Sequence, residues 1–173
     1  MVLQALTERV ILDRPMKPRL YVETSVVSYL AARKSRNSDT ANRQTITAHW
    51  WEQERHRYEI VASEAVEEEC RRGDREQSSR RIVILSGISI LNLNSEIMEL
   101  AEVLIAPGGL PVIARLDALH VAAAGFFRCD YLLTWNIRHI ANARTRAFAE
   151  RTLTSHGYKA PVICTPEELF SIP

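Results

Sequence analysis

Carboxylates stand beside mostly apolar segments at three places in this sequence. Glu23 follows the apolar residues 20–22, four glutamates gather within 64–69, and Asp117 precedes the mostly apolar residues 118–127. Carboxylate oxygens suit Mg²⁺ or Mn²⁺, which keep several waters and bind substrate phosphates. Clustered carboxylates would repel one another without such an ion. If the fold brings these acids together, they predict a divalent-metal site that handles phosphate groups.

Glu23 is placed where α/β proteins usually bind their ligands. Residues 20–22 are typical of a short buried strand, and Thr24 or Ser25 can cap a helix that follows it. The carboxylate would then lie at the C-terminal end of a strand, next to the crevice where open α/β sheets hold ligands. The alternative is that Glu23 only complements the positive end of the next helix.

The four glutamates fall on one predicted helix. Ser63 can cap a helix over 64–72, and Gly73 stands where a left-handed residue can end it. Most of these acids are expected to face water, because a run of charges is usually a solvated face. One of them can converge with Glu23, since the helix begins near a strand end on the same side of the sheet.

Asp117 belongs to a helix that is apolar on nearly every side. With Pro111 upstream, the helix is expected to start near Val112 and to contain Asp117. A carboxylate in such a helix is costly unless it is paired or bound to a cation. Asp117 and His120 are three residues apart and share a face. The alternative is that Asp117 is the helix cap and His120 a hydrogen-bonded core histidine.

The spacing of these segments predicts alternating strands and helices. Strands are expected at 20–22, 58–62, 88–93, 131–133 and 162–164, and the fourth delivers Thr134 and Asn136 to its C-terminal edge. This alternation predicts an α/β fold with a mostly parallel sheet flanked by helices. The sequence contains no Gly-rich phosphate loop, dinucleotide fingerprint or Gly-x-Ser-x-Gly motif, which argues against a nucleotide cofactor and an acyl hydrolase.

Composition limits the number of domains and the classes of protein that this sequence can form. The 173 residues, 46% of them hydrophobic, suit one soluble domain with one core, and the net charge of +1 gives no overall basic field. Three widely spaced cysteines suit buried thiols in a reducing cytosol better than disulfides. No segment approaches the length of a membrane span, so we expect a cytoplasmic protein with no membrane partner.

Residues 1–16 are expected to precede the domain, which would cover 17–173. Pro15 and Pro18 forbid a continuous helix between them, and Met16 is an alternative start. The other interpretation is a short amphipathic helix over 3–12 that lies on the body of the domain.

Four segments together resemble the successive motifs of PIN-domain ribonucleases. They are Tyr-Val-Glu-Thr-Ser at 21–25, Glu-Cys-Arg-Arg-Gly at 69–73, Asp-Ala-Leu-His-Val-Ala-Ala-Ala at 117–124 and Asp-Tyr-Leu-Leu-Thr-Trp-Asn at 130–136. Within that group the chain looks like a VapC-type toxin of a type II toxin–antitoxin system, over about 17–173. The resemblance implies a PIN-like three-layer α/β/α sandwich and a Mg²⁺- or Mn²⁺-dependent endoribonuclease. It also implies an RNA substrate, a homodimer and a cognate antitoxin protein.

Carried over to this sequence, the resemblance makes Glu23, Glu69 and Asp117 the metal ligands and catalytic acids. Glu69 is distinguished from the other glutamates by its spacing to Gly73. Two positions depart from the family pattern. The usual first acid is aspartate, which is one methylene shorter than glutamate, and the fourth acidic position holds Asn136. An asparagine can hold a water or a phosphate oxygen by hydrogen bonds but brings no charge.

The mechanism implied by the resemblance is metal-assisted hydrolysis of RNA phosphodiester bonds. Asn136 would orient a water or ligand, Thr24 and Thr134 would support the site, and Arg138 or His139 would contact the RNA backbone. The competing hypothesis is a PIN module, weak or inactive in catalysis, that binds RNA or a protein partner without cutting. Comparing RNA cleavage with RNA binding would separate the two.

Overall fold

The computed structural model describes residues 17–107 and 109–170, and the prediction for residues 1–16 lies outside this range. Five strands form one sheet in the order β3-β2-β1-β4-β5, and every neighbouring pair is parallel. The strands are β1 (Arg19–Val22), β2 (Glu59–Ser63), β3 (Ser89–Leu91), β4 (Tyr131–Leu133) and β5 (Val162–Cys164). The mostly parallel sheet predicted from the sequence is therefore confirmed.

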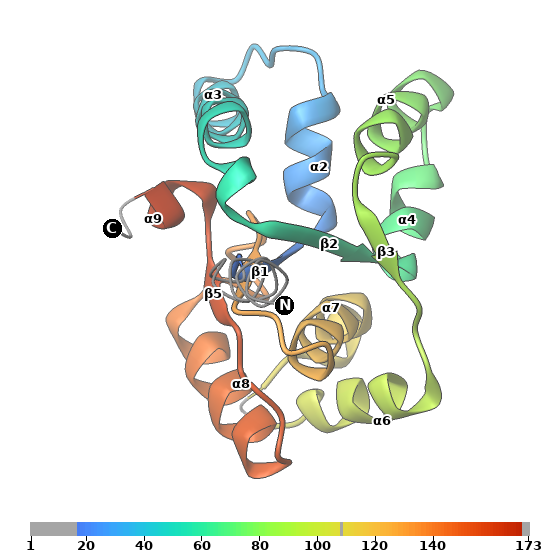
Figure 1. Ribbon diagram of the computed structural model, residues 1–173, viewed down its shortest axis with the longest axis vertical. Helices are drawn as coiled ribbons and strands as arrows, with labels where there is room; N and C mark the ends of the chain where they lie inside the picture. Colours follow the sequence, from blue (N-terminus) through green and yellow to red (C-terminus); the bar gives the residue numbers. More distant parts are fainter. Residues whose placement is uncertain (1–16, 108, 171–173) are drawn as a thin grey trace, which may run out of the picture.

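Helices cover both faces of this sheet and make a three-layer α/β/α sandwich. In Figure 1, α2, α3, α4 and α5 lie above the strands, whereas α6, α7 and α8 lie below them. The helices are α2 (Thr24–Ala31), α3 (Ser38–Gln53), α4 (Glu64–Arg71), α5 (Arg75–Leu85), α6 (Ser95–Leu104), α7 (Arg115–Phe126), α8 (Ala143–Ser155) and α9 (Pro166–Phe170). Short 3-10 helices span Arg55–Arg57 and Val112–Ala114. No described helix has both the length and the apolar character that crossing a membrane requires.

The buried helix predicted after Asp117 is the centre of the lower layer. Every residue from 118 to 125 in α7 is buried, and most of them are small. Small side chains let neighbouring helices approach closely: a Cβ added at Gly125 would lie 2.9 Å from a methyl carbon of Leu153 on α8. The start of this helix differs from the prediction. A 3-10 turn occupies Val112–Ala114, so Asp117 lies in the first turn of α7.

Two other helices begin with asparagine caps. Asn37 caps α3 by accepting a hydrogen bond from the Thr40 N–H at 3.0 Å, and Asn142 caps α8 by accepting one from the Thr145 N–H at 2.9 Å. Asparagine competes well for the free N–H groups of a helix N-terminus. Ser63 precedes α4 but does not cap it with its side chain, because its hydroxyl contacts Tyr21 instead.

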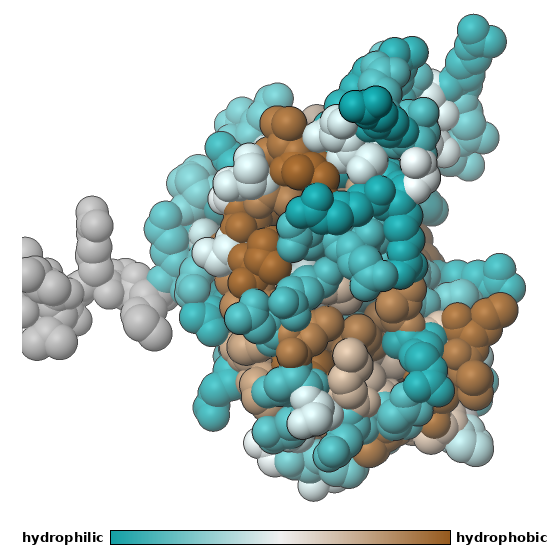
Figure 2. Space-filling model, turned by 90° about the vertical axis from the view of Figure 1, so that its right-hand side faces the viewer, coloured by the Kyte–Doolittle hydropathy of each residue, from teal (hydrophilic) through white to brown (hydrophobic). Residues whose placement is uncertain are grey.

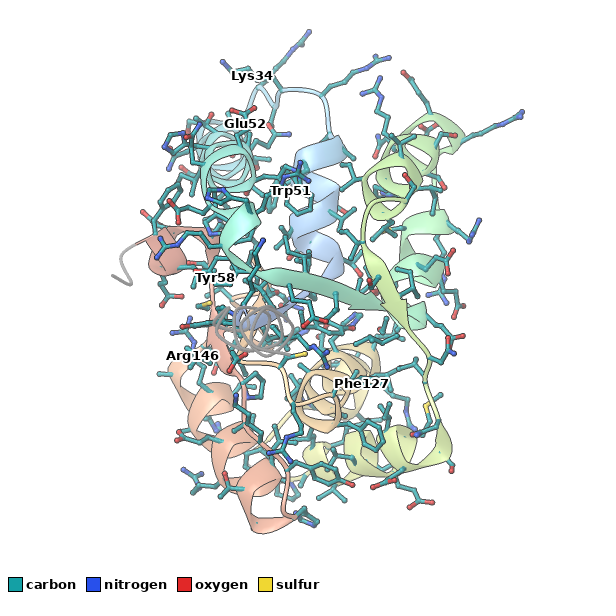
Figure 3. The ribbon with its side chains drawn as sticks, viewed as in Figure 1. Lys34, Trp51, Glu52, Tyr58, Phe127 and Arg146 are labelled. Carbon is teal, nitrogen blue, oxygen red and sulfur yellow. The ribbon has the colours of Figure 1, made fainter. Side chains whose placement is uncertain are left out.

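The two adjacent tryptophans of α3 have different surroundings. Trp50 is fully buried and lies beside Tyr58, with ring centroids 5.9 Å apart. Trp51 is partly buried against the core, on the side of α3 that faces α2 (Figure 3), and the Arg55 guanidinium lies 5.1 Å from the centre of its ring. Both rings therefore contact other side chains of the protein.

All three cysteines are buried and free, and we expect them to be unreactive in the folded protein. Burial raises the pKa of the Cys70 thiol to about 11 and of the Cys129 and Cys164 thiols to about 12. At pH 8 about a thousandth of Cys70, and less of the others, would be thiolate, which is the reactive form. Ellman's reagent should therefore label three thiols in guanidinium and almost none without it. Rapid labelling of even one thiol in the native protein would contradict this.

The short helix α9 is joined to α8 by an ion pair that predicts a pH dependence. Arg146 donates two hydrogen bonds to Glu168, at 2.8 and 2.7 Å, and these hold the pKa of Glu168 below its ordinary value despite partial burial. A carboxyl whose pKa is lowered by folding contributes stability above its unfolded pKa, and loses it as the pH falls through the folded pKa.

We therefore expect Glu168→Gln to be less stable than the unaltered protein at about pH 6, with the difference shrinking as the pH falls below the ordinary glutamate pKa of about 4.3 and through the lowered folded pKa. Urea unfolding midpoints measured across this range test the prediction. A difference that stays constant with pH would show that the charge of Glu168 has no part in it.

Candidate active site

Polar side chains from both helical layers meet at the C-terminal ends of β1 and β4. Glu23 follows β1 directly, and its N–H donates to the Leu133 carbonyl at 3.0 Å, which extends the pairing of the two strands by one residue. Thr134 follows β4 in the same way. The side chains delivered by these strand ends are therefore fixed by the sheet rather than by a loop.

The Glu23 carboxylate is buried, with 5% of the residue exposed, and is held by hydroxyl groups. Its Oε2 accepts a hydrogen bond from Thr134 Oγ1 at 2.7 Å and another from Ser25 Oγ. Ser25 Oγ in turn accepts from the Trp135 N–H at 2.8 Å. Thr134 and Ser25 thus both hold the Glu23 carboxylate; the resemblance gave Thr134 a supporting role, and Ser25 had none assigned.

Glu69 reaches the same region from α4. Its Oε2 accepts a hydrogen bond from Thr24 Oγ1 at 2.5 Å and lies 2.9 Å from His120 Nε2. Burial acts to raise the pKa of Glu69, but the contacts with His120 and Thr24 outweigh it and lower the pKa. Glu69 is therefore an anion at neutral pH. The other two glutamates near it in the sequence, Glu67 and Glu68, pair instead with arginines on the outer side of α4.

A buried chain of hydrogen bonds continues from His120 into the core. His120 Nδ1 lies 2.9 Å from the Tyr21 hydroxyl, which lies 2.6 Å from Ser63 Oγ. Burial raises the pKa of Tyr21, so its phenol keeps its proton. Burial also acts to lower the pKa of His120, but Glu69 and Glu23 outweigh this effect and raise it.

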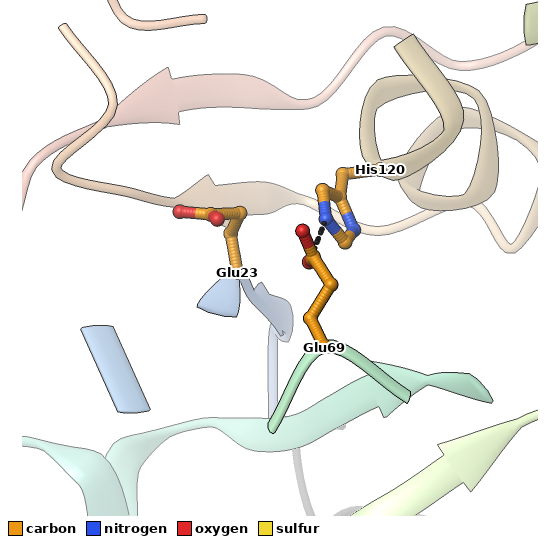
Figure 4. Close-up of side chains that lie close together, drawn as sticks. All are labelled: Glu23, Glu69 and His120. Atoms are coloured by element: carbon orange, nitrogen blue, oxygen red, sulfur yellow. Dashed lines mark hydrogen bonds and ion pairs between the residues drawn. The ribbon is translucent and has the colours of Figure 1, made fainter. Parts of the chain in front are cut away.

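Glu23, Glu69 and His120 form a group with the dimensions of a metal site. Each offers one ligand atom, and these atoms all lie within 4.8 Å of one another (Figure 4). The hydrogen bonds that described residues make to the two carboxylates all use Oε2, which leaves Oε1 of each for another partner. Two carboxylates and an imidazole are a donor set that fits a divalent cation.

Asp117, which the resemblance made the third ligand, is held in a neighbouring cluster. Its Oδ1 accepts a hydrogen bond from Asn136 Nδ2 at 2.9 Å, and its Oδ2 lies 2.8 Å from His139 Nδ1. Burial raises the pKa of Asp117 although His139 opposes the shift. The Asn136 N–H also donates to Thr134 Oγ1 at 2.9 Å, and the same hydroxyl donates to Glu23, so hydrogen bonds connect the two clusters.

The structure therefore places every predicted site residue around one end of the sheet, in two adjacent groups. Arg138 is exposed next to the Asp117 cluster, where it is accessible to a ligand. From the sequence, His120 could be marked only as a neighbour of Asp117, and Tyr21, although it opens the first motif, had no role of its own. No sequence signal identifies a tyrosine inside an apolar strand as the partner of a histidine 99 residues away.

Comparison with known proteins gives a likeness of fold. No family model matches the sequence, and no curated protein matches it. The crystal structure of VapC20 from Mycobacterium tuberculosis, a sarcin–ricin loop cleaving toxin, matches with a TM-score of 0.51 and 16% identity, over 74% of this chain and 94% of that chain. VapBC2 from Rickettsia felis, crystallised with a DNA fragment from its promoter, gives a TM-score of 0.46 and 12% identity, over 84% and 97%. The first match shows that the sandwich is PIN-like.

Proposed function

We propose that this protein is a divalent-metal-dependent endoribonuclease that hydrolyses RNA phosphodiester bonds, and that it is the toxin of a toxin–antitoxin pair. The observation that carries the proposal is the convergence of Glu23, Glu69 and His120 at the C-terminal end of the sheet in a PIN-like fold. The toxin activity of the structurally similar VapC20 and the four sequence motifs support the same conclusion.

The described residues suit this chemistry in distinct ways. Glu23 and Glu69 are proposed to hold Mg²⁺ or Mn²⁺, with Thr134 and Thr24 fixing their carboxylates. A bound divalent ion supplies a water of lowered pKa and neutralises charge on the phosphate. Asp117, the other acid of the motifs, is linked to this pair through Asn136, which donates to the Asp117 carboxylate and to the Thr134 hydroxyl that holds Glu23.

The Asp117 cluster provides the polar groups on the other side of the site. Asn136 and His139 contact the Asp117 carboxylate at 2.9 and 2.8 Å, which holds it in one orientation. We propose that Asn136 and His139, fixed in place by their bonds to Asp117, orient a water or an RNA phosphate oxygen. The exposed Arg138 is proposed to contact the RNA backbone. The partners would be RNA and a cognate antitoxin protein in the cytoplasm.

The proposed homodimer would use an exposed apolar face at the junction of α6 and α7. This apolar face consists of Met98, Val112, Ile113 and Leu116, and Ile113 is 89% exposed. Figure 2 shows hydrophobic side chains on the lower half of this side of the molecule, bordered by hydrophilic ones. A groove of about 450 Å³ beside it is rimmed by Glu68, Glu102 and Arg115 among others. Arg115 pairs with Glu102 on this rim, so the face would offer a second copy mainly apolar contacts.

We expect Ile113→Asp to convert a dimer into a monomer without unfolding the protein, because the side chain is already exposed and its loss leaves no cavity. Light scattering after size-exclusion chromatography would measure the change. Val83→Asp is the matched control, since Val83 is 72% exposed on α5, outside the apolar face. Dissociation by both variants, or a monomer before any substitution, would refute this assignment.

The experiment that tests the proposed function is cleavage of a pool of structured RNAs by the purified protein, freed of any partner. Cleavage should require Mn²⁺ or Mg²⁺, stop with a chelator and fall sharply in Asp117→Asn. RNA binding measured on the same samples identifies the alternative. Binding without cleavage under either ion would favour the module that binds RNA or a protein partner over the enzyme.

A further inference from the structure

His120 is the nitrogen-bearing member of a site whose other members are carboxylates. The residue is 1% exposed, and α7 directs its imidazole toward the carboxylates from the lower helical layer (Figure 4). Its Nε2 lies 2.9 Å from Glu69 Oε2, and the ligand atoms of Glu23, Glu69 and His120 all lie within 4.8 Å of one another. The ring is therefore close enough to share a cation with both acids.

The second ring nitrogen is held in the manner of a metal-binding histidine. Such a residue binds the metal through one nitrogen, while the other donates a hydrogen bond that fixes the tautomer and the ring plane. Here Nδ1 lies 2.9 Å from the buried Tyr21 hydroxyl, and that hydroxyl lies 2.6 Å from Ser63 Oγ. The phenol can accept from Nδ1–H and donate to Ser63, so Nε2, which faces the carboxylates, can bind an ion in place of its own proton.

The separation of the two facing atoms also fits ligands of one ion. Two adjacent ligands of an octahedral ion with bonds of about 2.1 Å are about 3 Å apart. Nε2 and Oε2 are 2.9 Å apart in the structure, so a small rotation of the Glu69 carboxylate would let either of its oxygens share an ion with the ring. The simpler role for His120 is to position Glu69 by a hydrogen bond without touching the metal. The two roles predict different results in the measurements below.

We propose that His120 Nε2 is a ligand of the divalent metal together with Glu23 and Glu69, and that this nitrogen makes the site prefer Mn²⁺ to Mg²⁺. The proposal rests on the proposed function for the presence of a metal in this site. Mg²⁺ takes oxygen ligands almost exclusively, whereas imidazole nitrogen binds first-row transition metals well. Asp117 remains with Asn136 and His139 beside the metal.

Electron spin-echo envelope modulation of Mn²⁺ bound to the full chain tests the ligand directly. A coordinated imidazole gives ¹⁴N modulation of the Mn²⁺ echo, and we expect this signal in the unaltered protein. Labelling the histidine rings with ¹⁵N should abolish the ¹⁴N pattern without changing the structure, so this result does not depend on any variant folding.

Two variants then identify which histidine is bound. His120→Gln should remove the nitrogen signal, and His139→Gln should retain it, because His139 contacts Asp117 rather than the carboxylate pair. Calorimetry should show that His120→Gln weakens Mn²⁺ binding about 10- to 100-fold, with a much smaller change for Mg²⁺. Equal losses for both ions would indicate that His120 only positions Glu69, and would overturn the proposal.

The outcomes separate this inference from the proposed function. Bound Mn²⁺ without nitrogen modulation overturns the ligand assignment and leaves the nuclease intact. Nitrogen modulation in a protein that cuts no RNA supports the ligand and rejects the nuclease. If neither Mn²⁺ nor Mg²⁺ binds to the unaltered protein, both conclusions are wrong.

Discussion

Replacing Glu69 by glutamine is expected to lower the rate of RNA cleavage at least about a hundredfold, because a proposed metal ligand loses its charge. The amide oxygen can still accept hydrogen bonds from Thr24 and His120, so the local structure should persist. The loss should therefore appear in the turnover number and in Mn²⁺ affinity rather than in the unfolding midpoint. Single-turnover cleavage at several Mn²⁺ concentrations would separate metal binding from the chemical step.

Its neighbour in the sequence provides the matched control. The Glu68 side chain is 68% exposed and pairs with Arg72 on the outer side of α4. Glu68→Gln removes the same charge from the same helix, and an exposed pair of this kind contributes little to stability. We expect it to change the cleavage rate less than about twofold. Similar losses in the two variants would mean that the total negative charge of α4, rather than the position of Glu69, governs the activity.

The largest expected effect on stability comes from Trp50. Its side chain is the largest of the fully buried ones among the described residues, so Trp50→Ala should lower the free energy of unfolding by about 3–5 kcal/mol. That is a substantial part of the 5–15 kcal/mol that is typical of a folded domain. Urea unfolding followed by circular dichroism would measure it, with Trp51→Ala as a control that removes a partly buried ring.

A second substitution distinguishes volume from polarity at this position. The indole N–H of Trp50 is buried without a hydrogen-bond partner among the described residues. An unsatisfied buried donor is unfavourable by about 1–3 kcal/mol, so Trp50→Phe should destabilise much less than its lost volume suggests. If phenylalanine is as damaging as alanine, the N–H has a partner that offsets its burial.

The sequence predicted the sheet and the main acids for identifiable reasons. Short apolar segments ending in polar residues marked β1 and β4, and Glu23 was found because it directly follows the first. Glu69 could be chosen from its helix only through the family motif, because local chemistry does not distinguish it from Glu67 or Glu68. Whether these acids bind a metal remains a prediction.

The contacts within the site could not be predicted, because they join segments far apart in the chain. Asp117, Asn136 and His139 were each noted, yet nothing in the sequence shows that the first binds the other two. His120 was expected to share a face with Asp117, but its ring nitrogens contact Tyr21 and Glu69 instead. Register between distant strands and helices decides such pairs, and periodicity carries no information about it.

The central position of β1 has a consequence for a growing polypeptide. β1 pairs with β2 on one side and β4 on the other, although β4 is made more than 100 residues later. Thr134, which holds Glu23, and His120, which contacts Glu69, also arrive in this late part of the chain. A ribosome that has released only β1 to β3 therefore carries three of the five strands and an unassembled site. The proposed RNA cleavage would therefore require that synthesis has passed β4.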